Sequence, residues 1–133
     1  MMESLFTRYP IFRYVPAVLL LAILFRTSAI TGEHMGWLQP PFDKFIHSGV
    51  YAALGFCFCF WFKNFRWDAH KIRCALVSVL LCVAFGVLDE FHQSFVPGRS
   101  VSAGDVVADL IGGIIGASLF IAIKPWKRFK IFR

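Results

Sequence analysis

The chain has 133 residues, of which 58% are hydrophobic, and its mean hydropathy is +0.65. A soluble domain of this size is nearer half apolar and could not bury so many apolar side chains, so the excess must face lipid. The net charge of +6 would suggest nucleic acid in a soluble protein, but the charges here stand in short segments between apolar runs. We interpret them as topology signals and contacts to anionic lipid, and we expect no nucleic-acid partner.

Four apolar segments follow one another along the chain, and we expect them to form a single transmembrane domain over residues 1–133. Each is long enough to cross a hydrocarbon core about 30 Å thick, with modest thinning or polar ends. The first has no clear small-residue cleavage site, so we expect a retained helix and not a signal peptide. The predicted helices cover residues 14–30, 45–62, 72–88 and 106–123.

The distribution of charge predicts the orientation of these helices. Lys and Arg collect on the cytoplasmic side of membrane proteins, and eleven of the fourteen lie before the first segment, between the second and third, or after the fourth. Six of the eight acids lie at the opposite ends. We therefore predict an all-α membrane four-helix bundle with both termini cytoplasmic. The eleven basic residues are Arg8, Arg13, Lys63, Arg66, Lys71, Arg73, Lys124, Lys127, Arg128, Lys130 and Arg133.

The start of the second segment carries a stripe of ionisable residues. At 100° per residue, Asp43, His47 and Tyr51 share one helix face, and Lys44 lies beside them. A helix cap with ordinary interfacial residues is the alternative, because the helix dipole favours an acid at an N-terminus. His47 lies deeper than a cap requires, so we expect it to pair with Asp43 across one helical turn.

The cysteines Cys57, Cys59, Cys74 and Cys82 all lie in or beside apolar segments, and we expect them to be small packing residues. Cys57 and Cys59 would point to different sides of a helix and form no ligand pair. No fixed-spacing metal motif is present, so we assign no metal ligand. A histidine-plus-carboxylate site assembled from different helices remains open, and no cofactor can be named.

Two adjacent carboxylates, Asp89 and Glu90, end the third segment, and Gln93 shares their arc. Such a pair is costly after an apolar run unless it faces protein or water, and the helix dipole disfavours negative charge at this end. Lys44, Arg99, a protonated histidine or a cation would compensate for it. The alternative is a solvated helix end that protrudes from the membrane.

The loop after the third segment and the fourth segment add further polar residues. Arg99 follows a Pro-Gly turn, and we expect it either to pair with a carboxylate or to bind a phosphate or carboxylate ligand. Asp105 and Asp109 share a narrow arc with Gly112 and Gly116, a small-xxx-small pattern that lets another helix approach closely. We expect both acids to point into the bundle, with an N-terminal cap as the alternative role of Asp105, and we expect the glycines to permit an oligomer. An acid within the membrane, such as Asp109, is a candidate functional residue.

Together these motifs resemble the VanZ-like family, which is named for a protein associated with low-level resistance to teicoplanin. The resemblance covers most of the chain between Asp43 and Gly116, and it implies a multi-pass protein of the bacterial cytoplasmic (inner) membrane. The family pattern usually has Asn where this chain has Asp109. The matching residues are Asp43-Lys44-x-x-His47-x-x-x-Tyr51, Asp89-Glu90-x-x-Gln93-x-Phe95-x-Pro97-Gly98-Arg99 and Asp105-x-x-x-Asp109-x-x-Gly112.

Three functions are compatible with these residues. The first is a binding protein whose outer polar pocket engages a lipid headgroup, a cell-wall precursor or a glycopeptide-type amphiphile, and which contributes to envelope modification or antibiotic resistance. The second is an enzyme acting on a lipid-linked phosphate, with His47, Glu90 and Asp89 as catalytic candidates and Arg99 holding the anion. The third is a purely structural polar network. The ligand-binding candidates are Asp43, Lys44, Tyr51, Gln93, Arg99, Asp105 and Asp109.

Overall fold

The computed structural model describes residues 9–35 and 41–124. Within these residues the chain is helical, with four α-helices, two short 3-10 helices and no strand, which confirms the predicted all-α class. The α-helices are α2 (Val15–Ser28), α3 (Phe42–Cys59), α4 (Asn64–Gln93) and α5 (Ala103–Ile123), and the 3-10 helices are η1 (Pro10–Arg13) and η2 (Gly32–Met35).

Helix α4 extends beyond the predicted segment 72–88 at both ends. It has 30 residues, and its first turns contain much of the basic stretch that was expected to be a connection. Charged and aromatic residues without Gly or Pro continue a helix readily, and only His70 (φ −142°, ψ 43°) departs from helical geometry, at a kink. At its other end α4 includes Asp89, Glu90 and Gln93, which are therefore on a helix and not in a loop.

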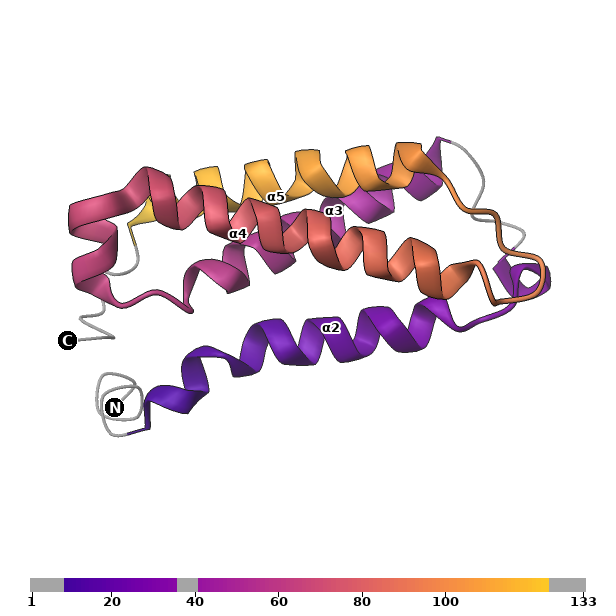
Figure 1. The fold of residues 1–133 in the computed structure, drawn as a ribbon, viewed down its shortest axis with the longest axis horizontal. Coiled ribbons are helices and arrows are strands. Elements are labelled where there is room, and N and C mark those ends of the chain that lie inside the picture. Colours follow the sequence, from indigo (N-terminus) through magenta and orange to yellow (C-terminus); the bar gives the residue numbers. More distant parts are fainter. Residues whose placement is uncertain (1–8, 36–40, 125–133) are drawn as a thin grey trace.

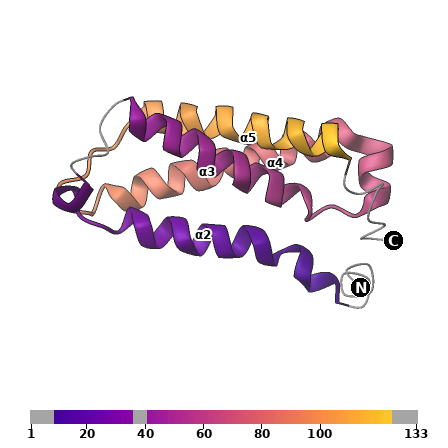
Figure 2. The ribbon, with the colours of Figure 1, turned by 180° about the vertical axis from the view of Figure 1, so that it is seen from behind.

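Helices α3 and α5 form the closest pair in the bundle, because glycines on α5 face α3 (Figures 1 and 2). A Cβ at Gly112 would overlap the Ser48 carbonyl oxygen, and one at Gly116 would overlap the Ala52 carbonyl oxygen. The predicted close approach is thus made within one chain. An oligomer formed through these two glycines stays a prediction.

Helix α2 runs along one side of the bundle and contacts α3 and α4 mainly through small and aliphatic residues (Figure 1). Ala17 is fully buried against Tyr51 and Leu54 of α3. Nearer the loop end of α2, the Phe25 ring stacks on His92 of α4 at 4.2 Å. The described chain begins and ends at one end of the bundle, because α2 starts and α5 finishes there (Figures 1 and 2).

The apolar core occupies the middle of the bundle and the end where α4 starts and α5 finishes. Trp67 and Phe120 are almost fully buried and pack together at 4.8 Å between ring centroids. Three cysteines are buried and one is half-buried, all as free thiols, in line with the packing role expected for them. They are Cys59, Cys74, Cys82 and the half-buried Cys57.

Two of the described helices, α4 and α5, are long and apolar enough to cross a membrane. Only 28% of the apolar window of α4 and 39% of that of α5 are buried, whereas the core helix of a soluble protein would be mostly buried. On α4 the exposed Ile72, Leu76 and Leu80 recur every four residues and form one apolar stripe. These features support a membrane protein. Four crossings and cytoplasmic termini remain predictions, and most of the terminal basic residues lie outside the described ranges.

Candidate functional site

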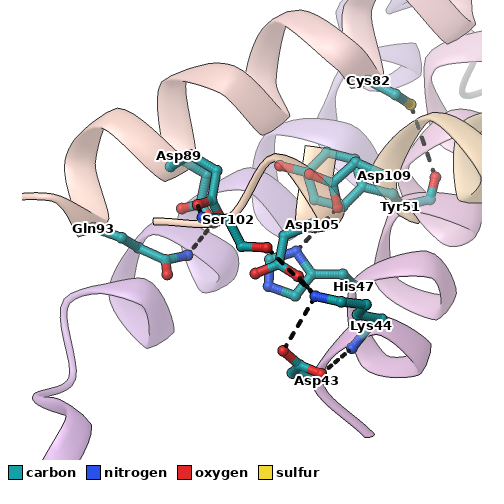
Figure 3. A network of polar contacts seen from close by, with 11 residues as sticks. Asp43, Lys44, His47, Tyr51, Cys82, Asp89, Gln93, Ser102, Asp105 and Asp109 are labelled. Carbon is teal, nitrogen blue, oxygen red and sulfur yellow. Dashed lines mark hydrogen bonds and ion pairs between the residues drawn. The ribbon is translucent and has the colours of Figure 1, made fainter. Parts of the chain in front are cut away.

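Three helices bring their polar ends together at the end of the bundle opposite the apolar core (Figure 3). Helices α3 and α5 begin there and α4 ends there, so residues separated by some 60 positions become neighbours. Helix α4 supplies Asp89, Glu90 and Gln93, α3 supplies Asp43, Lys44, His47 and Tyr51, and α5 supplies Asp105 and Asp109.

Lys44 is the cation of an ion-paired group at the start of α3 and α5. Its Nζ lies 2.7 Å from Asp105 Oδ1 and 3.6 Å from Asp43 Oδ2. Asp43 also accepts a hydrogen bond of 2.8 Å from the Lys44 backbone amide, which satisfies a free N–H at the helix start. Gly104 leaves room for the lysine, since a Cβ there would lie 3.2 Å from Lys44 Nζ. Lys44 therefore neutralises Asp105 and Asp43, and forms no ion pair with the carboxylates of α4.

His47 pairs with Asp109 of α5, and the expected pair with Asp43 is wrong. Its Nδ1 lies 3.0 Å from Asp109 Oδ1 (Figure 3). Asp109 is fully buried and reaches the histidine past Gly86 of α4, where a Cβ would overlap its Oδ2. Asp43 turns instead toward Lys44, because helix-end geometry offers it an amide and an ammonium. With Asp109 ionised, the carboxylate can only accept, so His47 would donate from Nδ1, and no contact is formed by its Nε2 among the described residues.

The two carboxylates of α4 are buried, so the alternative of a protruding solvated helix end is excluded. Asp89 is 2% exposed and accepts a hydrogen bond of 2.8 Å from Gln93 Nε2. Glu90 is 4% exposed and accepts one of 2.7 Å from the Ser102 backbone amide. Within the described ranges neither forms an ion pair with Lys or Arg. Asp89 Oδ1, Glu90 Oε1 and Asp109 Oδ2 are buried and have no hydrogen-bond partner there.

Arg99 lines a cavity of about 360 Å³ between α2, α3 and α4. It forms no ion pair with any described carboxylate, and its buried Nε has no partner in that part of the chain. Of the two roles expected for Arg99, pairing within the chain is therefore not observed. The apolar wall consists of Leu20, Ile23, Leu24, Ile46 and Val50, and the polar lining of Thr27, Ser28, His47, Tyr51, Asp89, Gln93 and Arg99.

The loop that carries Arg99 is attached to η2 by a glycine pair. Gly98 adopts φ +76°, which strongly favours glycine. Gly32 donates its amide hydrogen to the Pro97 carbonyl oxygen at 3.1 Å, and a Cβ at Gly32 would overlap Gly98. The Pro-Gly turn predicted from sequence is thus fixed by a segment more than 60 residues earlier, which places Arg99 at the mouth of the cavity.

Some contributors to the site had not been identified from the sequence. Ser102 contributes a backbone amide, which every residue except proline has, so its sequence gives no signal. Gly86 contributes space for Asp109, because it has no Cβ. Gly86 stands one helical turn before Glu90, and a glycine so close to paired acids was the available clue. His47, Glu90 and Asp105 each bring one metal-ligating atom to within 4.8 Å of the others. They come from three helices, so no spacing in the sequence could reveal the group.

The fold and the site together define a small all-helical membrane protein with a buried, mostly acidic polar cluster at one end of its bundle. The chain belongs to the VanZ/LLP1 family, whose sequence model matches residues 4–124, and this confirms the resemblance seen in the motifs. No curated protein and no solved structure matches the chain.

Proposed function

We propose that the protein binds an amphiphile in the cavity beside Arg99, with the headgroup at the polar end and the apolar tail along α2 and α3. The proposal includes four membrane crossings and a bacterial inner-membrane location. Lys63, Arg66 and Arg73 lie at the opposite end of the bundle from the site, so the positive-inside rule supports a site on the outer face.

The observation that carries the proposal is Arg99, which lines the cavity and forms no ion pair with any described carboxylate. The residue is half-buried, and its buried Nε has no partner among the described residues, which is costly for a polar donor withdrawn from water. The planar fork of arginine suits a phosphate or carboxylate group held by two parallel hydrogen bonds. The natural occupant is therefore an anion whose remainder is apolar.

Asp89 adds a second requirement to the headgroup. Its Oδ1 has no partner, and the residue lines the same cavity as Arg99. A ligand that offers an ammonium or hydroxyl hydrogen close to its anionic group would satisfy both residues. Phosphatidylethanolamine and phosphatidylglycerol have this chemistry. An amphiphilic glycopeptide such as teicoplanin also carries an amine and a carboxylate, at opposite ends of its peptide.

The other two functions account for less of the site. A structural network explains the contact between Lys44 and Asp105, but it leaves Arg99 unpaired. Of the three catalytic candidates, His47 and Asp89 line the cavity but Glu90 does not, so an enzyme that uses Glu90 on a ligand in this cavity is disfavoured. A binding role uses the residues that do line it.

Binding can be measured by native mass spectrometry and thermal stability of the purified chain in detergent. The probes are phosphatidylethanolamine, phosphatidylglycerol, phosphatidylcholine and teicoplanin. We expect at least one of the three probes with N–H or O–H donors to bind more tightly than phosphatidylcholine, whose headgroup lacks them. Arg99→Lys and Arg99→Gln should each weaken that binding about tenfold or more, the effect of losing a charge-assisted hydrogen bond.

The matched control is Arg26, which is exposed near the loop end of α2. Arg26→Lys and Arg26→Gln should leave binding unchanged, which separates a specific site from general attraction between basic residues and lipid. Equal loss in the Arg26 and Arg99 variants, or no binding of any probe, would contradict the proposal. Binding of teicoplanin alone would assign the site to glycopeptide recognition, and susceptibility tests of cells with wild type and Arg99→Lys would then measure resistance.

A further inference from the structure

We propose that His47, Glu90 and Asp105 form a binding site for one divalent transition-metal ion, with zinc or manganese as the fitting class. Their ligating atoms lie within 4.8 Å of one another on three different helices. Ligands about 2.1 Å from one ion lie roughly 3–4 Å apart, so small side-chain rotations suffice to enclose it. One imidazole and two carboxylates suit zinc and manganese, whereas Mg²⁺ and Ca²⁺ prefer oxygen ligands alone.

The partners of each ligand leave one atom free for the metal. Glu90 uses Oε2 for the Ser102 amide and leaves Oε1 without a partner, although the side chain is almost fully buried. Asp105 uses Oδ1 for Lys44 and keeps Oδ2. An unpartnered buried carboxylate oxygen is costly in an apolar protein interior, and a cation would remove that cost.

Asp109 gives His47 the orientation that a metal ligand needs. Histidines that bind metals usually donate their other ring N–H to a carboxylate, which fixes the tautomer and raises the basicity of the ligating nitrogen. Asp109 Oδ1 lies 3.0 Å from His47 Nδ1, and Nε2 is left for the ion. In Figure 3 a dashed line joins the His47 ring to Asp109. Asp109 is thus a positioning residue and not a ligand.

The charge of the cluster also favours a cation. Five carboxylates gather at this end, and among the described residues Lys44 forms ion pairs with two of them, Asp43 and Asp105. A divalent ion bound to Glu90 and Asp105 would offset much of the remaining negative charge. The site requires no amphiphile, so it stands or falls independently of the lipid-binding proposal.

The test is direct metal binding by the full chain, purified in detergent with a tag that contains no histidine and stripped with a chelator. Equilibrium dialysis against Zn²⁺ and against Mn²⁺, followed by elemental analysis, should give one ion per chain for at least one of the two metals. Glu90→Gln should lower the affinity at least tenfold, the scale seen when metal-site residues are altered. The amide can still accept the Ser102 hydrogen bond, so the fold should be kept.

The matched control is Glu33→Gln, which makes the same chemical change at an exposed position on η2. It should bind metal as wild type does. Substoichiometric binding of both metals by wild type, or equal affinities in Glu90→Gln and Glu33→Gln, would overturn the site. X-ray absorption of metal-loaded wild type needs no variant: it should show one imidazole and oxygen ligands, and a sulfur ligand would move the ion to the cysteines and overturn the assignment.

Discussion

Gly86 of α4 and Asp109 of α5 are in direct contact, and the missing side chain of the glycine is what admits the carboxylate. A Cβ at Gly86 would overlap Asp109 Oδ2 and lie 3.2 Å from its Cβ and Cγ. Asp109 reaches His47 through this gap. The histidine at the centre of the site is therefore oriented by a residue from another helix, and that contact depends on a glycine from a third.

Gly86→Ala should destabilise the folded protein by about 1–3 kcal/mol, because an added methyl group must displace a fully buried carboxylate. Thermal unfolding in detergent measures the change. Gly49→Ala is the matched control, since a Cβ at Gly49 meets nothing within 4 Å, and it should be neutral or slightly stabilising. Equal stability of the two variants would show that Asp109 is not confined as the structure has it.

Asp109→Asn should change the ring-nitrogen NMR signals of His47, whereas Asp43→Asn should leave them nearly unchanged. The reason is geometric, because Asp109 contacts the ring and Asp43 contacts Lys44. Asp109→Asn should also retain most of the stability, since an amide oxygen can accept the Nδ1 hydrogen bond, whereas Asp109→Leu should lose about 1–3 kcal/mol. A larger response of the ring to Asp43→Asn would restore the pairing expected from sequence.

The destabilisation by Lys44→Met and that by Asp105→Asn should add up to more than the destabilisation of the double variant, because each single change removes the same 2.7 Å contact. The coupling measured by a double-mutant cycle should be about 1 kcal/mol or less, since the Lys44 side chain is 39% exposed and water screens the pair. The coupling should shrink as salt is raised. Strict additivity of the two changes would mean that the ion pair contributes nothing to stability.

Reporter fusions should place the C-terminus in the cytoplasm and the loop at Gly98 on the opposite side. The expectation follows from the basic residues in the tail and around the start of α4. An alkaline phosphatase and a fluorescent reporter, which are active on opposite sides, provide the measurement. Equal locations for the two fusions would exclude four crossings and would put the site on a different face.

The membrane character, the helices and most members of the site could be predicted from the sequence. Apolar run length and helical periodicity are local properties, so they placed Asp43, His47 and Tyr51 on one face and identified the acids of the third and fourth segments. Each part of the family motif also lies within one short segment, and the match of the family model to residues 4–124 confirms the resemblance. Helix formation and the face on which a residue lies depend on residues a few positions away, so they can be predicted from the sequence alone.

Only the tertiary structure decided which of these residues meet. The rotation and closeness of α3, α4 and α5 are set by contacts such as Gly112 against Ser48 and Gly86 against Asp109, between positions far apart in the chain. Those contacts turn His47 to Asp109. The structure also places Arg99 at a cavity, where it forms no ion pair with any described carboxylate. The periodicity of a helical segment predicts which face of the helix a residue lies on. Which residue of another helix lies opposite that face is decided by the packing of the helices, because steric fit between backbones far apart in the sequence sets how they pack.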